Sequence, residues 1–123
     1  GELRSAERRA VAGRPYRGLL IELPLAPQVL PRKPSPAQTE QALADAYRDS
    51  PIVRVLPADD VSLVRVGDDA GTDRLTIRVF GNADRGQARM IATLDNLGKG
   101  AGGAAVQNLN IMAGFDQTEG LVL

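Results

Sequence analysis

The feature that most constrains this chain is a glycine-rich segment that follows directly after an apolar run. Residues 90–94 read MIATL, and residues 95–108 continue as DNLGKGAGGAAVQN into a helix-like pattern. Glycine lowers helix stability, so glycines repeated at a helix start indicate close backbone packing, contact with a ligand, or both. A strand that leads into a helix start of this kind is a common place to bind an anionic or amide-bearing group.

Residues 98–103 formally match the G-x-G-x-x-G pattern of dinucleotide-binding folds. That motif also requires a second strand after the helix, ending in an acidic residue, and the residues after Gly103 accommodate only a helix and a tail. The segment is not a P-loop, because no Ser or Thr follows Lys99. The polar groups of this junction are Asn96 and Lys99, and the alternative reading is that Asn96 caps a turn while Lys99 is solvated.

Composition excludes several classes of function. The chain has 123 residues, no Cys and no His, so it lacks the usual thiol nucleophile and the usual neutral-pH proton shuttle. Fifteen acidic residues balance fifteen basic ones, which does not indicate a nucleic-acid or acidic-membrane partner. The apolar runs are too short to span a bilayer. The absence of Cys fits a cytoplasmic protein, and we expect no signal peptide.

We also expect no metal site. The acidic pairs at residues 59–60 and 68–69 lack the alternating oxygen spacing of a calcium loop. Both pairs stand in polar, turn-like segments, so we interpret them as solvated turns.

Periodicity and turn residues predict the secondary structure. Residues 75–80 alternate apolar and polar side chains, and with residues 87–94 and a turn at 82–86 they predict a β-hairpin. Ser35, Pro36 and Gln38 predict a capping box and a helix to about residue 48. The other predicted elements are strands at 18–25, 52–56 and 61–66, a turn at 67–73, and a helix at 100–113 ended by Gly114. This order favours an α+β fold, a mostly antiparallel sheet with helices on one face plus a C-terminal helix.

The run DNLGKGAGGAAVQNLNIMAGFDQTEGL resembles the closing segment of the N-acetyl-gamma-glutamyl-phosphate reductases, in the semialdehyde dehydrogenase superfamily. Three upstream segments also correspond to that family. Residues 16–19 match a strand that begins with Arg-Gly, the helix that ends at Ala46-Tyr47 matches a helix, and residues 50–55 match the strand that follows it. The resemblance covers residues 14–123 and implies part of the substrate and oligomerisation domain, with its terminal helix at 100–113. Residues 1–13 match poorly and form a lead-in.

The resemblance implies a cofactor and a site. That family reduces an acyl phosphate to a semialdehyde with NADPH in arginine biosynthesis, using a Rossmann domain, a Cys that forms a thioester, and a His that assists. This chain lacks all three, so we expect no catalytic residue in it, no activity from it alone and no tight NADP binding by it alone. By the same resemblance, Asn96 approaches the nicotinamide amide, and Gly98, Lys99 and Gly100 line the cleft.

Two classes of function remain open at this point. The first is part of a reductase, whose partner is a missing N-terminal cofactor domain; a fragment of a lysine-pathway relative is a variant of it. The second is a non-catalytic dimerisation or assembly module. Both predict a homo-oligomer, and an in-frame upstream segment with a Cys motif would distinguish them.

Overall fold

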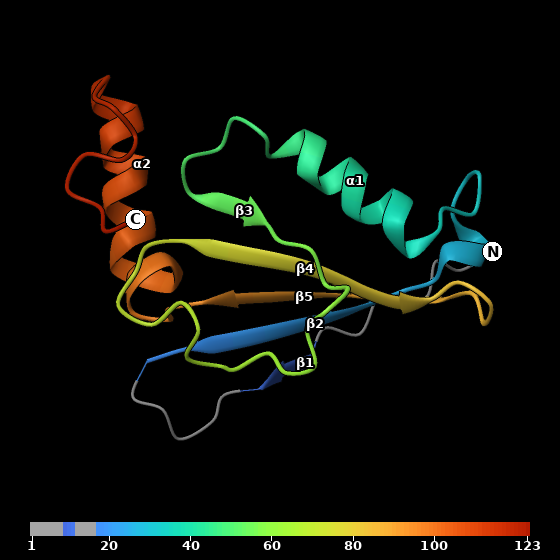
Figure 1. Cartoon of the computed structure of the whole chain (residues 1–123). Coiled ribbons are helices and arrows are strands. Elements are labelled where there is room, and N and C mark those ends of the chain that lie inside the picture. Colours follow the sequence, from blue (N-terminus) through green and yellow to red (C-terminus); the bar gives the residue numbers. More distant parts are fainter. Residues whose placement is uncertain (1–8, 12–16) are drawn as a thin grey trace.

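A five-stranded sheet forms the centre of the molecule (Figure 1). The computed structural model describes residues 9–11, as backbone, and residues 17–123. The strands lie in the order β1-β2-β5-β4-β3, and every neighbouring pair is antiparallel except β3–β4, which is parallel. Their bounds are β1 Arg9–Val11, β2 Leu19–Leu25, β3 Val53–Val55, β4 Leu75–Asn82 and β5 Gln87–Leu94.

Two α-helices accompany the sheet, which confirms the predicted α+β class. Helix α1 spans Pro36–Ala46 and packs against β4 and β3. Helix α2 spans Gly103–Ala113, follows the π-helical turn η2 (Gly98–Gly102), and lies at one end of the sheet (Figure 1). A short 3-10 turn, η1, spans Pro27–Val29. In residues 9–11 and 17–123, neither helix has the length and hydropathy of a membrane-spanning segment.

The predicted hairpin and the predicted capping box are both present. Strands β4 and β5 pair from Leu75 opposite Leu94 to Asn82 opposite Gln87. The turn between them uses Gly86 in the left-handed region, at φ 60°, which glycine adopts at low cost. At the start of α1, the Ser35 hydroxyl accepts from the Gln38 backbone N–H, and the Gln38 side chain accepts from the Ser35 backbone N–H.

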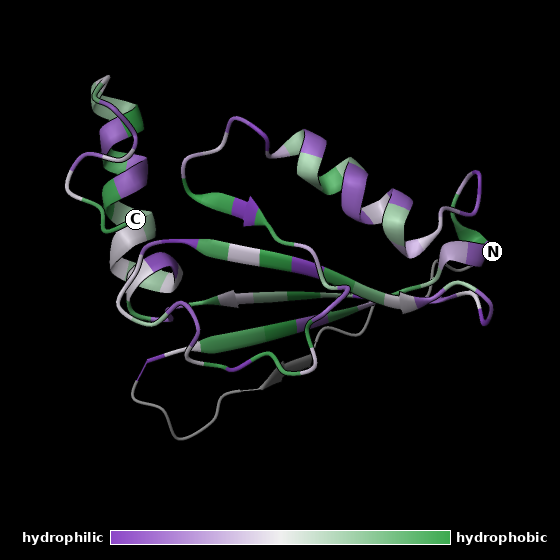
Figure 2. Cartoon of the chain, viewed as in Figure 1, coloured by the Kyte–Doolittle hydropathy of each residue, from purple (hydrophilic) through white to green (hydrophobic). Residues whose placement is uncertain are grey.

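The two faces of the sheet differ in character. Residues paired across antiparallel strands share a face, so one face carries the aliphatic rows that include Ile77, Val79 and Ala92, all buried. Helix α1 covers this face at β3 and β4, where Gly81 leaves room for Pro36. Figure 2 shows the hydrophobic stretches along the strands. This packing is the main core.

The opposite face is mixed in polarity and is partly covered by the loop between β3 and β4. Thr76 and Thr93, paired across the hairpin, are each only 1% exposed on this face. The alternation at residues 75–80 is typical of a strand buried on one side only. In β4, however, the loop also covers the opposite side at Thr76.

One predicted strand is wrong and one strand was missed. Residues 61–66 form no ladder and belong to the loop, where the backbone N–H of Val61 bonds to Ala58 and that of Arg65 bonds to the Asp68 side chain. Val61, Val64 and Val66, whose side chains favour strands, are half-buried in this loop. Strand β1 falls inside the predicted lead-in, residues 1–13, of which residues 1–8, 12 and 13 lie outside the described residues.

Candidate functional site

Asp95 organises the end of β5. Its side chain is fully buried. One carboxylate oxygen accepts from the backbone N–H of Leu97 at 2.8 Å and of Gly98 at 3.0 Å. The other accepts from the Gly71 N–H at 2.6 Å and pairs with the Arg17 Nε at 2.9 Å. This single carboxylate therefore joins the β3–β4 loop, the segment before β2, and the glycine-rich turn.

The surroundings of Asp95 favour its ionised form. Burial alone would raise the pKa of this carboxyl group. The hydrogen bonds from the Gly71, Gly98 and Leu97 N–H groups, together with the Arg17 charge, outweigh burial and lower the pKa below its ordinary value.

Asn96 lies at the surface beside the start of β2. Its Oδ1 accepts from the Gly18 backbone N–H at 2.8 Å, which fixes the orientation of its side-chain amide. Gly18 has φ 130°, and a Cβ there would lie 2.4 Å from the Val66 carbonyl oxygen, so this position requires glycine. The Asn96 side chain thus connects the end of β5 to the backbone at the start of β2, two segments that are far apart in the sequence.

The glycines of the junction divide into two groups. A Cβ on Gly98 would lie 2.9 Å from an Asp73 carboxylate oxygen, and one on Gly103 only 2.0 Å from it. These two glycines therefore make room for the Asp73 side chain, and packing explains them. Gly100 and Gly102 are exposed, and their packing is looser. A Cβ on Gly100 would lie 3.0 Å from Leu94 Cδ1, and one on Gly102 would lie 3.3 Å from the Leu97 carbonyl oxygen.

Lys99 is half-buried, and its side chain runs along α2. Its Nζ donates to Gln107 Oε1 at 2.7 Å, and Gln107 Nε2 donates to Gln117 Oε1 at 3.1 Å. The predicted site residues Asn96, Gly98, Lys99 and Gly100 thus lie together around η2. Sequence reasoning missed Asp73 and Asp95, and the position of Asp95 directly after a buried strand was the available signal.

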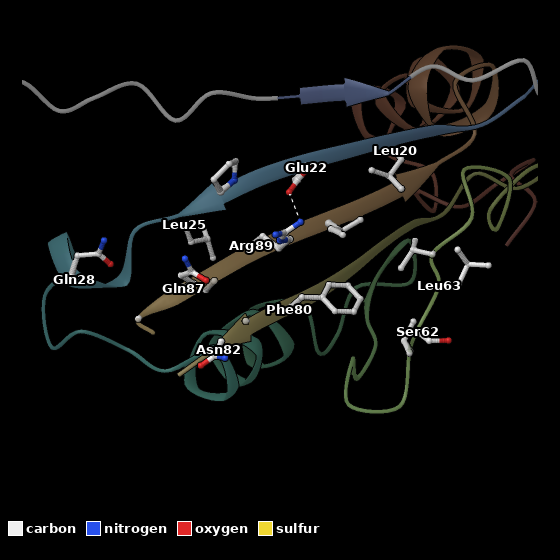
Figure 3. A pocket seen from close by; sticks show the side chains of 17 residues that line it. Leu20, Glu22, Leu25, Gln28, Ser62, Leu63, Phe80, Asn82, Gln87 and Arg89 are labelled. Atoms are coloured by element: carbon white, nitrogen blue, oxygen red, sulfur yellow. Dashed lines mark ion pairs between the residues drawn. The ribbon is translucent and has the colours of Figure 1, made fainter. Parts of the chain in front are cut away.

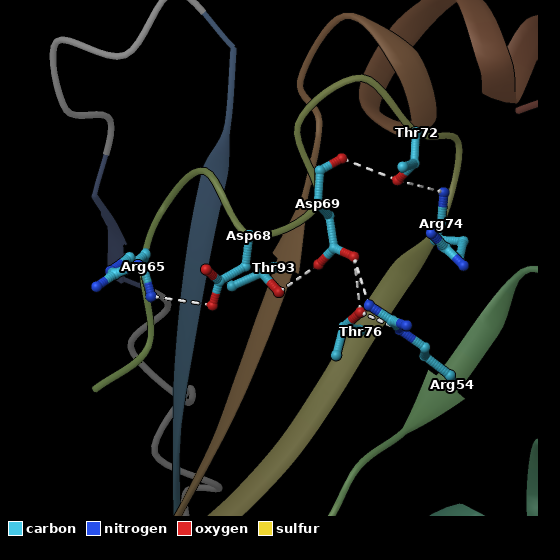
Figure 4. A network of polar contacts seen from close by, with 8 residues as sticks. All are labelled: Arg54, Arg65, Asp68, Asp69, Thr72, Arg74, Thr76 and Thr93. Atoms are coloured by element: carbon cyan, nitrogen blue, oxygen red, sulfur yellow. Dashed lines mark hydrogen bonds and ion pairs between the residues drawn. The ribbon is translucent and has the colours of Figure 1, made fainter. Parts of the chain in front are cut away.

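A second buried carboxylate corrects an interpretation made from the sequence. Asp69 does not lie in a solvated turn but is 1% exposed. It accepts from the hydroxyls of Thr76 at 2.8 Å and Thr93 at 2.5 Å, and it pairs with Arg54 at 3.2 Å (Figure 4). This network attaches the β3–β4 loop to the sheet. Among the described residues, no three acidic side chains gather as a metal site would require.

The mixed face of the sheet carries an open groove of about 760 Å³. Leu20, Phe80 and Ile91 contribute apolar side chains, and the loop residue Leu63 lies along its rim (Figure 3). An ion pair crosses from β5 to β2, where Arg89 Nη1 lies 3.0 Å from Glu22 Oε1. The groove is therefore lined about equally by polar and apolar surface, and it contains a pair of opposite charges.

Comparison with known proteins relates this arrangement to a family. Residues 10–96 match the family model described as "Semialdehyde dehydrogenase, dimerisation domain". The chain belongs to this family. The matched segment contains β2 to β5, α1 and all of β1 except Arg9, while η2 and α2 lie beyond it. The family match therefore covers the sheet and leaves out the C-terminal helix.

The curated relatives of this dimerisation-domain chain are reductases by name. N-acetyl-gamma-glutamyl-phosphate reductase 2 of Nostoc sp. is 46% identical over 110 residues, which cover 85% of this chain and 34% of the relative. N-acetyl-gamma-glutamyl-phosphate reductases of Brucella ovis and Brucella abortus are 43% identical over 105 residues, covering 83% of this chain and 34% of each relative. The chain spans about a third of the length of these relatives.

Proposed function

We propose that this chain is the C-terminal part of an NADP-dependent N-acetyl-gamma-glutamyl-phosphate reductase of arginine biosynthesis, working in the cytoplasm. The identity of 43–46% with reductases of that name carries the proposal. In this assignment residues 14–123 form part of the substrate and oligomerisation domain, and residues 1–13 form a lead-in. The nucleophile and the cofactor domain belong to a part of the protein outside this sequence, which has no Cys and no His.

We further propose that the turn around η2 is this domain's contribution to the cofactor cleft, through Asn96, Gly98, Lys99 and Gly100. The residues present suit that role. The Asn96 amide nitrogen carries two donors that match a nicotinamide carboxamide oxygen, and its orientation is fixed by Gly18. The backbone of Gly100 is exposed, so a ligand can reach it. When bound, NADPH supplies the hydride, and the work of this domain is to orient it.

The variant Asn96→Asp tests this contact. An aspartate keeps the oxygen that accepts from the Gly18 N–H, but it removes the two amide donors, so we expect NADPH binding to weaken by roughly tenfold. Fluorescence titration of NADPH into the full-length protein measures the effect. Asn108→Asp, an exposed position on α2, is the matched control and should leave affinity unchanged. Equal affinity for both variants would exclude Asn96 from the cofactor site.

The groove on the mixed face is our proposed dimer interface, and a second copy of this chain is its occupant. The groove exposes apolar side chains, among them Leu20, Phe80 and Ile91, on a sheet face that another protein surface can bury. Arg89 is 59% exposed although it is paired with Glu22. In a two-fold interface a contact of one residue with a second residue of the other copy occurs twice, so Arg89 of each copy can pair with Glu22 of the other. The family description as a dimerisation domain supports this assignment.

Placing a charge in the groove should separate the two copies. Phe80→Glu would bury a carboxylate without a partner at the interface. We therefore expect the unaltered chain to be a dimer at a protein concentration of roughly tens of micromolar and the variant to be a monomer. Light scattering after size exclusion measures the mass. Tyr47→Glu, exposed at the end of α1, is the control and should remain dimeric. A monomeric unaltered chain would argue against the interface.

A further inference from the structure

The C-terminal segment, residues 115–122, folds back along α2 and is held at several points. The backbone N–H of Phe115 bonds to the Asn110 carbonyl at 2.9 Å. The buried Asn110 side chain donates to the Glu119 carbonyl at 2.8 Å and the Gln117 carbonyl at 3.4 Å. Near the end of the chain, Val122 exchanges two hydrogen bonds with Asp73, through its carbonyl at 2.7 Å and its N–H at 2.9 Å. The segment is therefore a fixed part of the fold.

Two routes of contacts connect the C-terminal segment to the glycine-rich turn. The carboxylate of Asp73 that accepts from Val122 also fills the space beside Gly98 and Gly103. The second route is the hydrogen-bonded chain from Gln117 through Gln107 to Lys99. The C-terminal segment thus reaches the proposed cofactor cleft through both the backbone and a side chain.

The direction of the second route is set by the chemistry of the amide group. A glutamine amide has an acceptor oxygen and a donor nitrogen at opposite ends. Gln117 Oε1 accepts from the nitrogen of Gln107, which turns the oxygen of Gln107 toward the Lys99 ammonium. The Lys99 ammonium, which can only donate, favours the same orientation, so Gln117 and Lys99 together fix the Gln107 amide, and without Gln117 only Lys99 holds it.

We propose that Gln117 and Gln107 are positioning residues that hold the Lys99 ammonium in place for a phosphate group of the bound dinucleotide. This proposal rests on the proposed function. An ammonium has three donors, so Lys99 keeps its bond to Gln107 while others remain for phosphate oxygens. Lysine has a long flexible side chain, and ordering it before the ligand arrives lowers the entropic cost of binding.

The test compares Gln117→Leu with Gln117→Glu in the full-length protein. Leucine removes the acceptor, whereas glutamate keeps an oxygen that accepts from the Gln107 nitrogen. We expect Gln117→Leu to raise the Kd for NADPH roughly three- to tenfold, the equivalent of one hydrogen bond. Gln117→Glu should restore it. The KM for the acyl phosphate substrate should stay unchanged, because the phosphate in question belongs to the cofactor; a rise in that KM alone would assign Lys99 to the substrate and overturn the proposal.

The remaining outcomes also decide. A merely structural role would lower Tm without changing the Kd for NADPH, which would overturn the positioning role. If leucine and glutamate weaken binding equally, the acceptor is not what matters, and the proposal fails. If the unaltered full-length protein does not bind NADPH, the proposed function fails together with this inference, whereas binding that ignores both substitutions contradicts the inference alone.

Discussion

Replacing Asp95 with alanine should lower the free energy of unfolding of this domain by about 3 kcal/mol or more. The substitution leaves three backbone N–H groups and the Arg17 guanidinium without their acceptor, in a place where Asp95 itself is fully buried. Buried donors that lose their partner keep the full cost of desolvation. Urea unfolding measures the change, and Asp84→Ala, exposed in the hairpin turn, should stay within about 0.5 kcal/mol. Equal stability of the two variants would show that Asp95 is not the organising contact.

The same carboxylate gives the domain a defined response to acid. The pKa of Asp95 is lowered in the folded chain, so near its ordinary value the unfolded chain binds more protons than the folded one. Its stabilisation is therefore present above a pH of about 4 and is lost as pH falls through the lower folded pKa. The stability difference between the unaltered chain and Asp95→Asn should shrink below that pH. A difference that is constant down to acid pH would contradict the assignment.

The second large effect should come from Asp69. Asp69→Ala removes the acceptor shared by the hydroxyls of Thr76 and Thr93, both almost fully buried, and leaves Arg54 unpaired. We expect a loss of about 2–4 kcal/mol, most of it from the two hydroxyls because Arg54 is partly exposed to water.

The neighbouring residue supplies the control for this prediction. Asp68 is exposed and its side chain accepts from the Arg65 backbone N–H, so Asp68→Ala should cost about 1 kcal/mol or less. Thermal or urea unfolding of the two alanine variants compares adjacent carboxylates directly. Similar losses at both positions would mean that the loop does not depend on the buried network for its attachment to the sheet.

The elements that the sequence predicted correctly depend on local chemistry. The capping box of α1 joins residues three apart, the hairpin joins strands across a short turn, and Gly114 ends α2 in the left-handed region at φ 77°. Each signal lies within a few residues of the structure it determines. The resemblance to the reductases also identified the family correctly.

What the sequence could not show depends on contacts between distant residues. In the sequence, Asp69 is one of two acidic residues in a polar turn. In the structure, its carboxylate accepts from the buried hydroxyl of Thr93, which lies 24 positions away. The glycines left packing and ligand contact equally open until Asp73 was placed beside Gly98 and Gly103. The 61–66 segment has the valines of a strand, but these half-buried valines lie in a loop. Periodicity reports burial and does not report whether a ladder forms.

The most direct test of the whole account is the reverse reaction, oxidation of N-acetylglutamate semialdehyde with NADP and phosphate. We predict phosphate-dependent formation of NADPH by the full-length protein and none above background by this chain alone, since 123 residues without Cys or His offer no group to form the thioester. Turnover by the isolated chain would contradict the account. So would an inactive full-length protein, and persistence of its dimer would then favour a non-catalytic assembly module.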